Sequence, residues 1–233
     1  MSDRRRIVIL PGLDGTGRLL VEFAEHLRSH FTVDVIAYPV DKPKTYDELM
    51  SYVQERLPRD EYILIGESFS GPLAIRLASQ NFPSLKAVVL GASFARLDFP
   101  VKGLMDKLVE WAPRQLIPFA VLNFLLMGGR ATEELRQGVK EVLKGVQPEV
   151  LKIRAKEALN VDLIQSQFEV EQPVLYLQAL ADRLIPSSAA KHIGRIAPQT
   201  VVHGIDAPHF LFQMEPLACA KAIIEFDISL SNS

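Results

Sequence analysis

Cysteine is almost absent from this chain of 233 residues, which contains only Cys219. One thiol excludes an intramolecular disulfide and argues against a zinc site built on cysteine. A chain with so little cysteine fits a reducing compartment, so we expect a cytoplasmic protein. The chain is long enough to bury a large apolar core, and it therefore needs neither a disulfide nor a structural metal to fold.

The sequence also lacks an excess of charge of one sign. It has 26 Lys and Arg against 28 Asp and Glu, a formal net charge of −2. Nucleic-acid-binding proteins usually concentrate positive charge on one face, so we expect no nucleic-acid partner. The basic cluster at residues 4–6 is short and terminal, and we interpret it as a solvated lead-in to the first strand.

Long hydrophobic runs are missing as well. A membrane-spanning helix needs roughly 18 apolar residues. The longest apolar stretch, residues 116–127, is interrupted by Pro118 and Asn123. The apolar run Ile7 to Leu10 falls short of the roughly 7–15 residues of a signal peptide. With 48% hydrophobic residues, the chain is instead expected to be a soluble globular protein without stable membrane insertion.

Short β-rich runs alternate with helical patterns along most of the chain. The runs are continuously apolar, which is typical of strands buried on both faces of a parallel sheet. Strand–helix alternation predicts an α/β fold with a mostly parallel sheet covered by helices. The expected strands are Ile7–Leu10, Val33–Tyr38, Tyr62–Ile65, Ala87–Leu90, Val174–Leu177 and Thr200–Val202. The expected helices between them are Leu19–Leu27, Tyr46–Leu57, Ser68–Ser79, Ser188–Ile196 and Pro216–Phe226.

The alternation stops once, between residues 95 and 172. This segment contains no convincing strand but has several helical patterns punctuated by proline and glycine. A loop of that length is unusual inside a compact domain, so we expect a helical insertion. Its expected helices are Leu104–Trp111, Phe119–Met127, Glu133–Leu143 and Glu149–Ile164.

Ser68 lies between an apolar strand and a helix, in the string Gly66-Glu67-Ser68-Phe69-Ser70-Gly71. A nucleophilic serine on such a sharp turn needs small residues two positions before and after it, which Gly66 and Ser70 provide. The helix that follows offers its N-terminal dipole and N–H groups to a developing anion. The alternative is that Ser68 only caps the helix, because Ser70 breaks the strict Gly-x-Ser-x-Gly pattern.

This strand–turn–helix resembles the nucleophile elbow of the α/β-hydrolase superfamily, whose catalytic residues follow the order Ser, Asp, His. The resemblance implies a core of residues 1–94 and 173–233 with a helical cap or lid at 95–172, folded as one cooperative unit. It also implies catalysis without a metal or cofactor, and it covers the whole chain, the core more closely than the insertion.

The loop Ile9 to Gly17 matches the position of the superfamily's oxyanion loop, although Pro11-Gly12 replaces the common His-Gly. The resemblance implies that the backbone N–H groups of Leu13 and Phe69 form the oxyanion hole. Phosphate binding is the alternative for a glycine-rich loop, but neither nucleotide-binding glycine pattern is present. The string from residue 10 to 17 also resembles small bacterial hydrolases and plant esterase or acyltransferase relatives.

Asp182 follows an apolar strand and precedes Pro186, as the acid of the superfamily does. Its implied role is to orient the catalytic imidazole and stabilise the imidazolium. An exposed turn aspartate is the alternative.

His209 lies in the loop after the last expected strand and is followed by the aromatic Phe210, so it is the candidate base. Of the other histidines, His203 at a strand end is the rival. His26 and His30 lack an accompanying carboxylate pattern for a metal, and His192 is expected to be exposed on a helix.

The cap is rich in apolar residues, most of which we expect to pack it onto the core, while some line an acyl pocket. Candidate substrate-binding residues are Asp14, Phe124, Met127 and Phe210. The sequence thus predicts a serine hydrolase for esters or thioesters of a lipophilic acyl group, with a small-molecule substrate. Acyl transfer, C–C bond cleavage or lyase chemistry on the same triad is the alternative, followed by a non-catalytic binding module. Whether the chain forms a homodimer is undetermined from sequence.

Overall fold

The computed structural model describes residues 4–98, 119–165 and 168–231. Its centre is one six-stranded sheet in the order β2-β1-β3-β4-β5-β6, with every neighbouring pair parallel. This confirms the predicted α/β class and the presence of six strands, although the second ends at Val35 and not at Tyr38 as expected. The strands are β1 (Arg6–Leu10), β2 (Thr32–Val35), β3 (Tyr62–Glu67), β4 (Leu85–Gly91), β5 (Val174–Ala179) and β6 (Thr200–Ile205).

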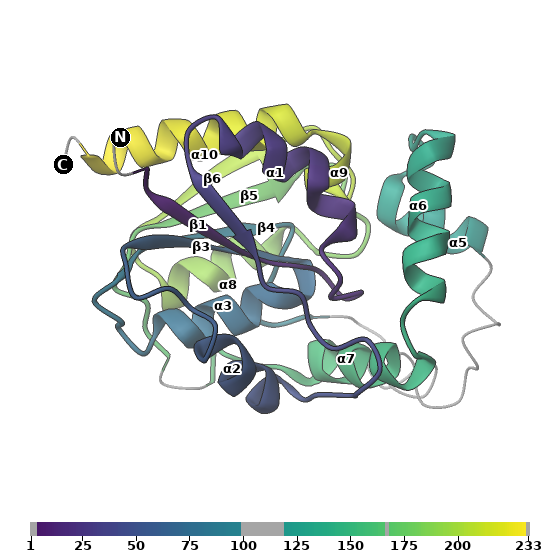
Figure 1. Cartoon of the computed structure of the whole chain (residues 1–233), viewed down its shortest axis with the longest axis horizontal. Helices are drawn as coiled ribbons and strands as arrows, with labels where there is room; N and C mark the ends of the chain where they lie inside the picture. Colours follow the sequence, from purple (N-terminus) through teal and green to yellow (C-terminus); the bar gives the residue numbers. More distant parts are fainter. Residues whose placement is uncertain (1–3, 99–118, 166–167, 232–233) are drawn as a thin grey trace.

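The strands are apolar throughout because both faces of the sheet are covered. Successive side chains of a strand point to opposite faces. In β1, Ile7 and Ile9 join one buried cluster, whereas Val8 and Leu10 join the other. Helices α1 (Val21–Arg28) and α10 (Pro216–Ser231) cover the first face, and α2 (Tyr46–Gln54), α3 (Gly71–Ala78) and α8 (Ser188–Ile196) cover the second (Figure 1).

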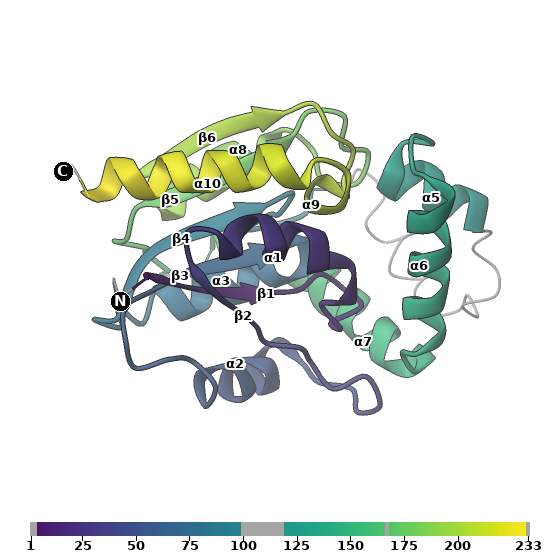
Figure 2. The ribbon, with the colours of Figure 1, turned by 45° about the horizontal axis from the view of Figure 1, so that its top comes forward.

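The insertion between β4 and β5 contains α5 (Phe119–Met127), α6 (Glu133–Lys144) and α7 (Pro148–Asn160). Local signals explain two of the starts: Thr132 caps α6 through the N–H of Leu135, and Pro148 opens α7. Arg96, which follows β4, and Asp162, which follows α7, form an isolated antiparallel bridge. All three helices lie beyond the carboxyl ends of the strands (Figure 2).

The expected helix Leu104–Trp111 lies outside the described residues, as do Leu116 and Ile117 of the apolar stretch 116–127. In the part of the chain that is described, the helices all fall short of the length and apolarity required to cross a membrane.

Candidate active site

Ser68 occupies a strained turn between β3 and α3. Its φ is +46°, in the left-handed region that side chains other than glycine seldom adopt. A short 3-10 turn, Ser68–Ser70, joins it to α3. Gly66 and Gly71 make this turn sterically feasible: a Cβ on Gly66 would lie 2.8 Å from the carbonyl oxygen of Ser70, and one on Gly71 1.7 Å from Ser93 Oγ. Ser93 holds the turn by donating a 2.6 Å hydrogen bond to the carbonyl oxygen of Ser68.

Ser70, which replaces the last glycine of the strict pattern, has a structural use of its own. Its buried hydroxyl donates to the carbonyl oxygen of Pro11 and accepts from the phenol of Tyr38, whose oxygen lies 2.6 Å away. The serine proton can serve only the carbonyl, so the phenol must be the second donor. The departure from the pattern therefore ties the turn at Ser68 to the loop that follows β1.

Three side chains predicted from the sequence form one continuous hydrogen-bond chain. Ser68 Oγ lies 2.8 Å from His209 Nε2, and His209 Nδ1 lies 2.8 Å from Asp182 Oδ2. The carboxylate accepts from Nδ1–H, which leaves Nε2 as the acceptor for the serine proton. The structure thus brings Ser68, Asp182 and His209 together from the carboxyl ends of β3, β5 and β6. The rival His203 lies on β6 and is exposed.

Asp182 is fixed by the loop in which it lies. Its Oδ1 accepts hydrogen bonds from the backbone N–H groups of Leu184 at 2.8 Å and Ile185 at 2.9 Å. The side chains of Asp182 and His209 are each 4% exposed, which shields their contact from water. One carboxyl oxygen is thereby anchored to the backbone and the other is directed to the imidazole, so the acid orients the ring.

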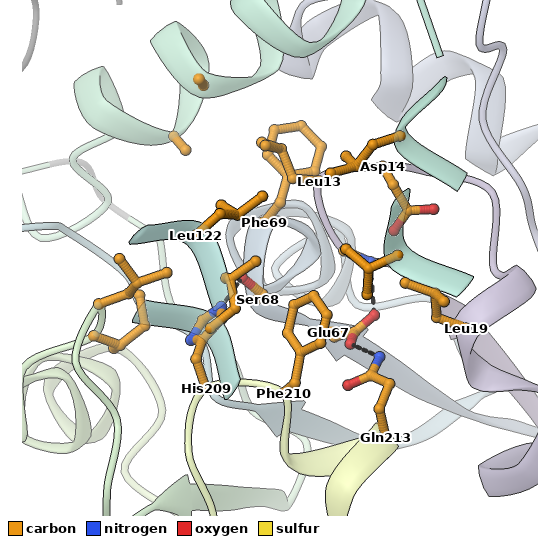
Figure 3. Close-up of a pocket in the computed structure, with 18 of the residues that line it drawn as sticks. Leu13, Asp14, Leu19, Glu67, Ser68, Phe69, Leu122, His209, Phe210 and Gln213 are labelled. Atoms are coloured by element: carbon orange, nitrogen blue, oxygen red, sulfur yellow. Dashed lines mark hydrogen bonds between the residues drawn. The ribbon is translucent and has the colours of Figure 1, made fainter. Parts of the chain in front are cut away.

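The loop after β1 forms a tight turn in which Gly15 N–H donates to the carbonyl oxygen of Gly12 at 3.0 Å. Among the hydrogen bonds of the described residues, none uses the backbone N–H of Leu13. Across the site, the carbonyl oxygen of Phe69 accepts a 2.7 Å bond from the buried phenol of Tyr46, whose ring also stacks on that of Phe69. Leu13 and Phe69 both line the cavity next to Ser68 (Figure 3).

A cavity of about 290 Å³ opens at Ser68 and His209 between the core and the insertion. Its walls are mostly aliphatic, and the acidic Asp14 and Glu67 with the amide Gln213 form its polar end (Figure 3). The insertion contributes Leu122, Leu126, Val139, Val142, Leu143, Ala155, Ala158 and Leu159. Further apolar lining comes from Leu97 in the segment after β4, and from Leu19, Phe94, Leu184, Ile185 and Phe210 of the core.

The four predicted substrate-binding residues divide into two pairs. Asp14 and Phe210 line the cavity. Phe124 does not: its side chain is 53% exposed and lies 4.3 Å from the guanidinium of Arg183. Met127 is fully buried in a small cluster with Ala131 and Val139 and does not line the cavity. The turn of α5 that faces the cavity is instead formed by Leu122 and Leu126.

His192 corrects another expectation from the sequence. It is buried rather than exposed, and its Nε2 lies 3.4 Å from a carboxyl oxygen of Asp98. Helix α8 packs against the core through a buried stripe that includes this residue, which explains the difference.

Two charged residues near the cavity have no role assigned by the sequence: Glu67, whose position beside Ser68 indicates only that it could shape the pocket, and Arg154. Glu67 is buried, and its carboxyl accepts from the N–H of Gly12 at 2.8 Å and from Gln213 Nε2 at 2.6 Å. Burial raises its pKa to about 7, and the charge of Asp14 acts in the same direction. Arg154 of α7 is completely buried, and burial lowers its pKa. Glycine next to a buried strand end indicated close packing at Gly12, but nothing in the sequence pointed to Arg154.

Solved structures of low sequence identity share this architecture. A hydrolase from Pseudomonas aeruginosa PA01 aligns with a TM-score of 0.81 at 18% identity, covering 97% of this chain and 91% of that one. A hydrolase from Oleispira antarctica gives a TM-score of 0.82 at 17% identity, covering 100% and 93%. The enol-lactonase from Burkholderia xenovorans LB400 gives 0.78 at 16% identity, covering 97% and 92%. The chain therefore has the α/β-hydrolase fold of these proteins.

The curated relatives differ in how much of their length the chain covers. Phytyl ester synthase 1 of Arabidopsis thaliana is 27% identical over 226 residues, covering 80% of this chain and 31% of the plant protein. The chain thus spans about a third of that relative. Pimeloyl-[acyl-carrier protein] methyl ester esterase of Vibrio atlanticus is 23% identical over 241 residues, covering 94% and 93%. No family model matches the chain.

Proposed function

We propose that this α/β hydrolase is a serine esterase that cleaves carboxylic esters or thioesters of a lipophilic acyl group through an acyl-enzyme. The observation that carries the proposal is the hydrogen-bond chain from Ser68 through His209 to Asp182, which opens directly into an apolar cavity. The esterase name of the Vibrio relative and the ester-forming name of the plant relative support ester chemistry.

Acylation begins at Ser68. His209 Nε2 takes the hydroxyl proton as Oγ attacks the acyl carbonyl, and Asp182 stabilises the imidazolium that forms. The carbonyl oxygen becomes an oxyanion, which the backbone N–H groups of Leu13 and Phe69 stabilise. The 3-10 turn and helix that start at Ser68 add the positive end of their dipole.

Collapse of the first tetrahedral intermediate breaks the bond to the leaving group, which receives the proton held by His209. A water molecule then attacks the acyl-enzyme, and His209 removes its proton in the same way. The second collapse returns the proton to Ser68 and releases the carboxylic acid. In each step the catalytic groups come from this chain, and the only other reactants are the substrate and water.

The cavity supports a lipophilic acyl group. Its walls are aliphatic over most of their length, and burial of methylene groups against them contributes roughly 0.8 kcal/mol each. The charged side chains that line it, Asp14 and Glu67, are acidic, which disfavours a substrate with a carboxylate at that end.

The test is labelling of Ser68 by a fluorophosphonate probe, combined with hydrolysis of p-nitrophenyl esters and acyl-CoA thioesters of graded chain length. Wild-type protein should label and hydrolyse, and Ser68→Ala should do neither. Ser79→Ala on α3 is the matched control, because its hydroxyl bonds only to a local carbonyl oxygen. Equal labelling of wild type and Ser68→Ala would refute the proposal.

Acyl transfer to an alcohol is the second candidate, favoured by the synthase name of the plant relative. It uses the same acyl-enzyme, but an alcohol instead of water attacks it in the deacylation step. Product analysis with a long-chain alcohol present distinguishes the two: ester product rising at the expense of free acid indicates transfer, and free acid alone indicates hydrolysis.

A further inference from the structure

Glu67 links three segments of the site. It is the residue before Ser68, its Oε2 accepts from the N–H of Gly12, and its Oε1 accepts from Gln213, four residues after His209. Both carboxyl oxygens therefore act as acceptors, which suits the ionised form. A Cβ on Gly12 would lie 3.2 Å from Glu67 Oε2, so the backbone approaches the carboxyl as closely as a glycine allows.

Arg154 holds the other side of the same loop. Its guanidinium donates to the carbonyl oxygens of Leu13 at 2.9 Å, Asp14 at 2.7 Å and Pro39 at 2.8 Å. The residue comes from α7 of the insertion, and it is fully buried. An apolar residue of similar volume would avoid the cost of desolvating a charge, so its three directed contacts suggest a use other than packing.

These contacts engage the loop from both sides, and among the described residues no recorded hydrogen bond uses the N–H groups of Leu13 and Asp14. The N–H of Gly12 donates to Glu67, and the carbonyl oxygen of Leu13 accepts from Arg154. The N–H of Gly15 donates to the carbonyl oxygen of Gly12 within the turn. The N–H of Leu13, which lies between them in sequence, has no recorded partner among the described residues. The peptide units on both sides of this N–H are thus held by buried charged groups.

We propose that Glu67 and Arg154 are positioning residues that hold the loop 12–15 with the N–H of Leu13 directed at the oxygen of the reacting carbonyl. The proposal rests on the serine-esterase function above. Donors fixed in advance stabilise a developing oxyanion without reorganising during the reaction. Loss of the contact to Glu67 or to Arg154 lets the loop move. The hydrogen bond from the N–H of Leu13 to the substrate oxygen then weakens more in the transition state than in the ground state.

The groups around Glu67 determine at which pH its carboxyl ionises. Asp14 of the oxyanion loop raises the pKa of Glu67, whereas Gln213 of α9, the N–H of Gly12 and the charge of His209 lower it. Tyr38, and Cys219 on α10, lie close enough that the charge of Glu67 adds to the effect of burial in raising their pKa values. Because Glu67 titrates at about 7, the ionised form that accepts both bonds predominates only above neutral pH.

The experiment compares Arg154→Lys, Arg154→Met and Glu67→Gln with wild type in kcat, KM and affinity for an alkyl boronic acid, which forms an oxyanion-like adduct on the serine. Arg130→Met is the matched control, because Arg130 is an insertion arginine that is 56% exposed and pairs with Asp206. We expect kcat to fall about 10- to 100-fold with KM within about threefold, below the roughly 10²–10³ for loss of a whole donor. Boronate affinity should fall by the same factor as kcat/KM.

Several outcomes separate the possibilities. Unchanged kcat, or a loss confined to KM, in variants with a wild-type thermal transition would overturn the positioning role. Boronate affinity that stays at the wild-type level while kcat falls would do the same. If Arg154→Met does not fold, Arg154→Lys and Glu67→Gln decide, since both preserve size and polarity. Activity that survives Ser68→Ala would instead refute the esterase function itself.

Discussion

The backbone N–H of Phe210 donates a 3.0 Å hydrogen bond to the carbonyl oxygen of Leu126. Phe210 follows His209 directly, and Leu126 is a wall of the cavity on α5. On the same helix, Phe124 contacts Arg183, the neighbour of Asp182. The helix that shapes the cavity is therefore attached to the loops of both the base and the acid, so changes in the wall are expected to reach the proposed chemistry.

Narrowing the cavity should change chain-length preference. Leu122 lines the cavity, whereas its neighbour Val121 is 45% exposed. We expect Leu122→Trp to lower kcat/KM for decanoyl and longer esters about tenfold or more, since one misfit methylene already costs ~1–3 kcal/mol. Acetyl and butyryl esters should be affected much less. Val121→Trp should leave the whole p-nitrophenyl series unchanged, and a similar loss in both variants would mean that the acyl group binds elsewhere.

Neutralising the acid should impair catalysis without unfolding the protein. Asp182→Asn keeps the shape of the side chain but favours the wrong imidazole tautomer, and in serine proteases this change costs about 10⁴ in kcat. We expect a loss on the order of 10³–10⁴ here, measured as kcat on a good ester substrate. Asp206→Asn, at a site 82% exposed, should behave as wild type. Comparable activity in the two variants would argue against Asp182 as the acid.

Removing the hydroxyl of Ser70 should cost stability. Ser70→Ala leaves the buried phenol of Tyr38 and the carbonyl oxygen of Pro11 without their shared partner. A buried unsatisfied group costs about 1–3 kcal/mol, so the free energy of unfolding should fall by that amount in urea titrations. Adding Tyr38→Phe should recover part of the loss. A double variant no more stable than Ser70→Ala would show that the phenol is not the penalised group.

The carboxyl of Glu67 should make stability fall with rising pH. Its pKa is raised to about 7 in the folded chain, above that of an unfolded glutamate. Between these two pKa values the native state holds a proton that the unfolded state has released, so stability decreases as pH rises through this window and stays low above it. The full effect is on the order of 3 kcal/mol.

Glu67→Gln removes this titration, so the Tm of the variant relative to wild type should increase from pH 5 to pH 8 in thermal melts. Glu225→Gln is the control, because Glu225 is 61% exposed, and it should show a constant offset. A Glu67→Gln offset that does not change with pH would contradict the raised pKa. The same substitution is expected to lower activity, which would make Glu67 a case of stability given up for function.

The sequence predicted the sheet well because its signals are local. Each strand is a short apolar run bounded by turn residues. Because both faces of the sheet are buried, these runs are apolar throughout and are easy to recognise. The relation of Ser68, Asp182 and His209 was predictable for a related reason. Parallel strands bring their carboxyl ends to one edge, so a residue that follows each strand meets the others there.

The walls of the cavity were less predictable because α5 is apolar on almost every side. Its sequence, Phe-Ala-Val-Leu-Asn-Phe-Leu-Leu-Met, has no polar face to indicate which residues point inward. Residue type alone therefore favours Phe124 and Met127 as lining residues, whereas in the folded chain Leu122 and Leu126 line the cavity. Arg154 escaped prediction because its partners are backbone carbonyl oxygens 115 to 141 positions away, and backbone groups carry no sequence signal.

Arg154 and Gly15 occupy overlapping space. Gly15 has φ +74°, and a Cβ there would lie 2.4 Å from the guanidinium of Arg154. A side chain at position 15 would be strained at this φ and would displace the guanidinium from the carbonyl oxygens that it binds. Across related sequences we therefore expect chains that retain the arginine to retain this glycine as well.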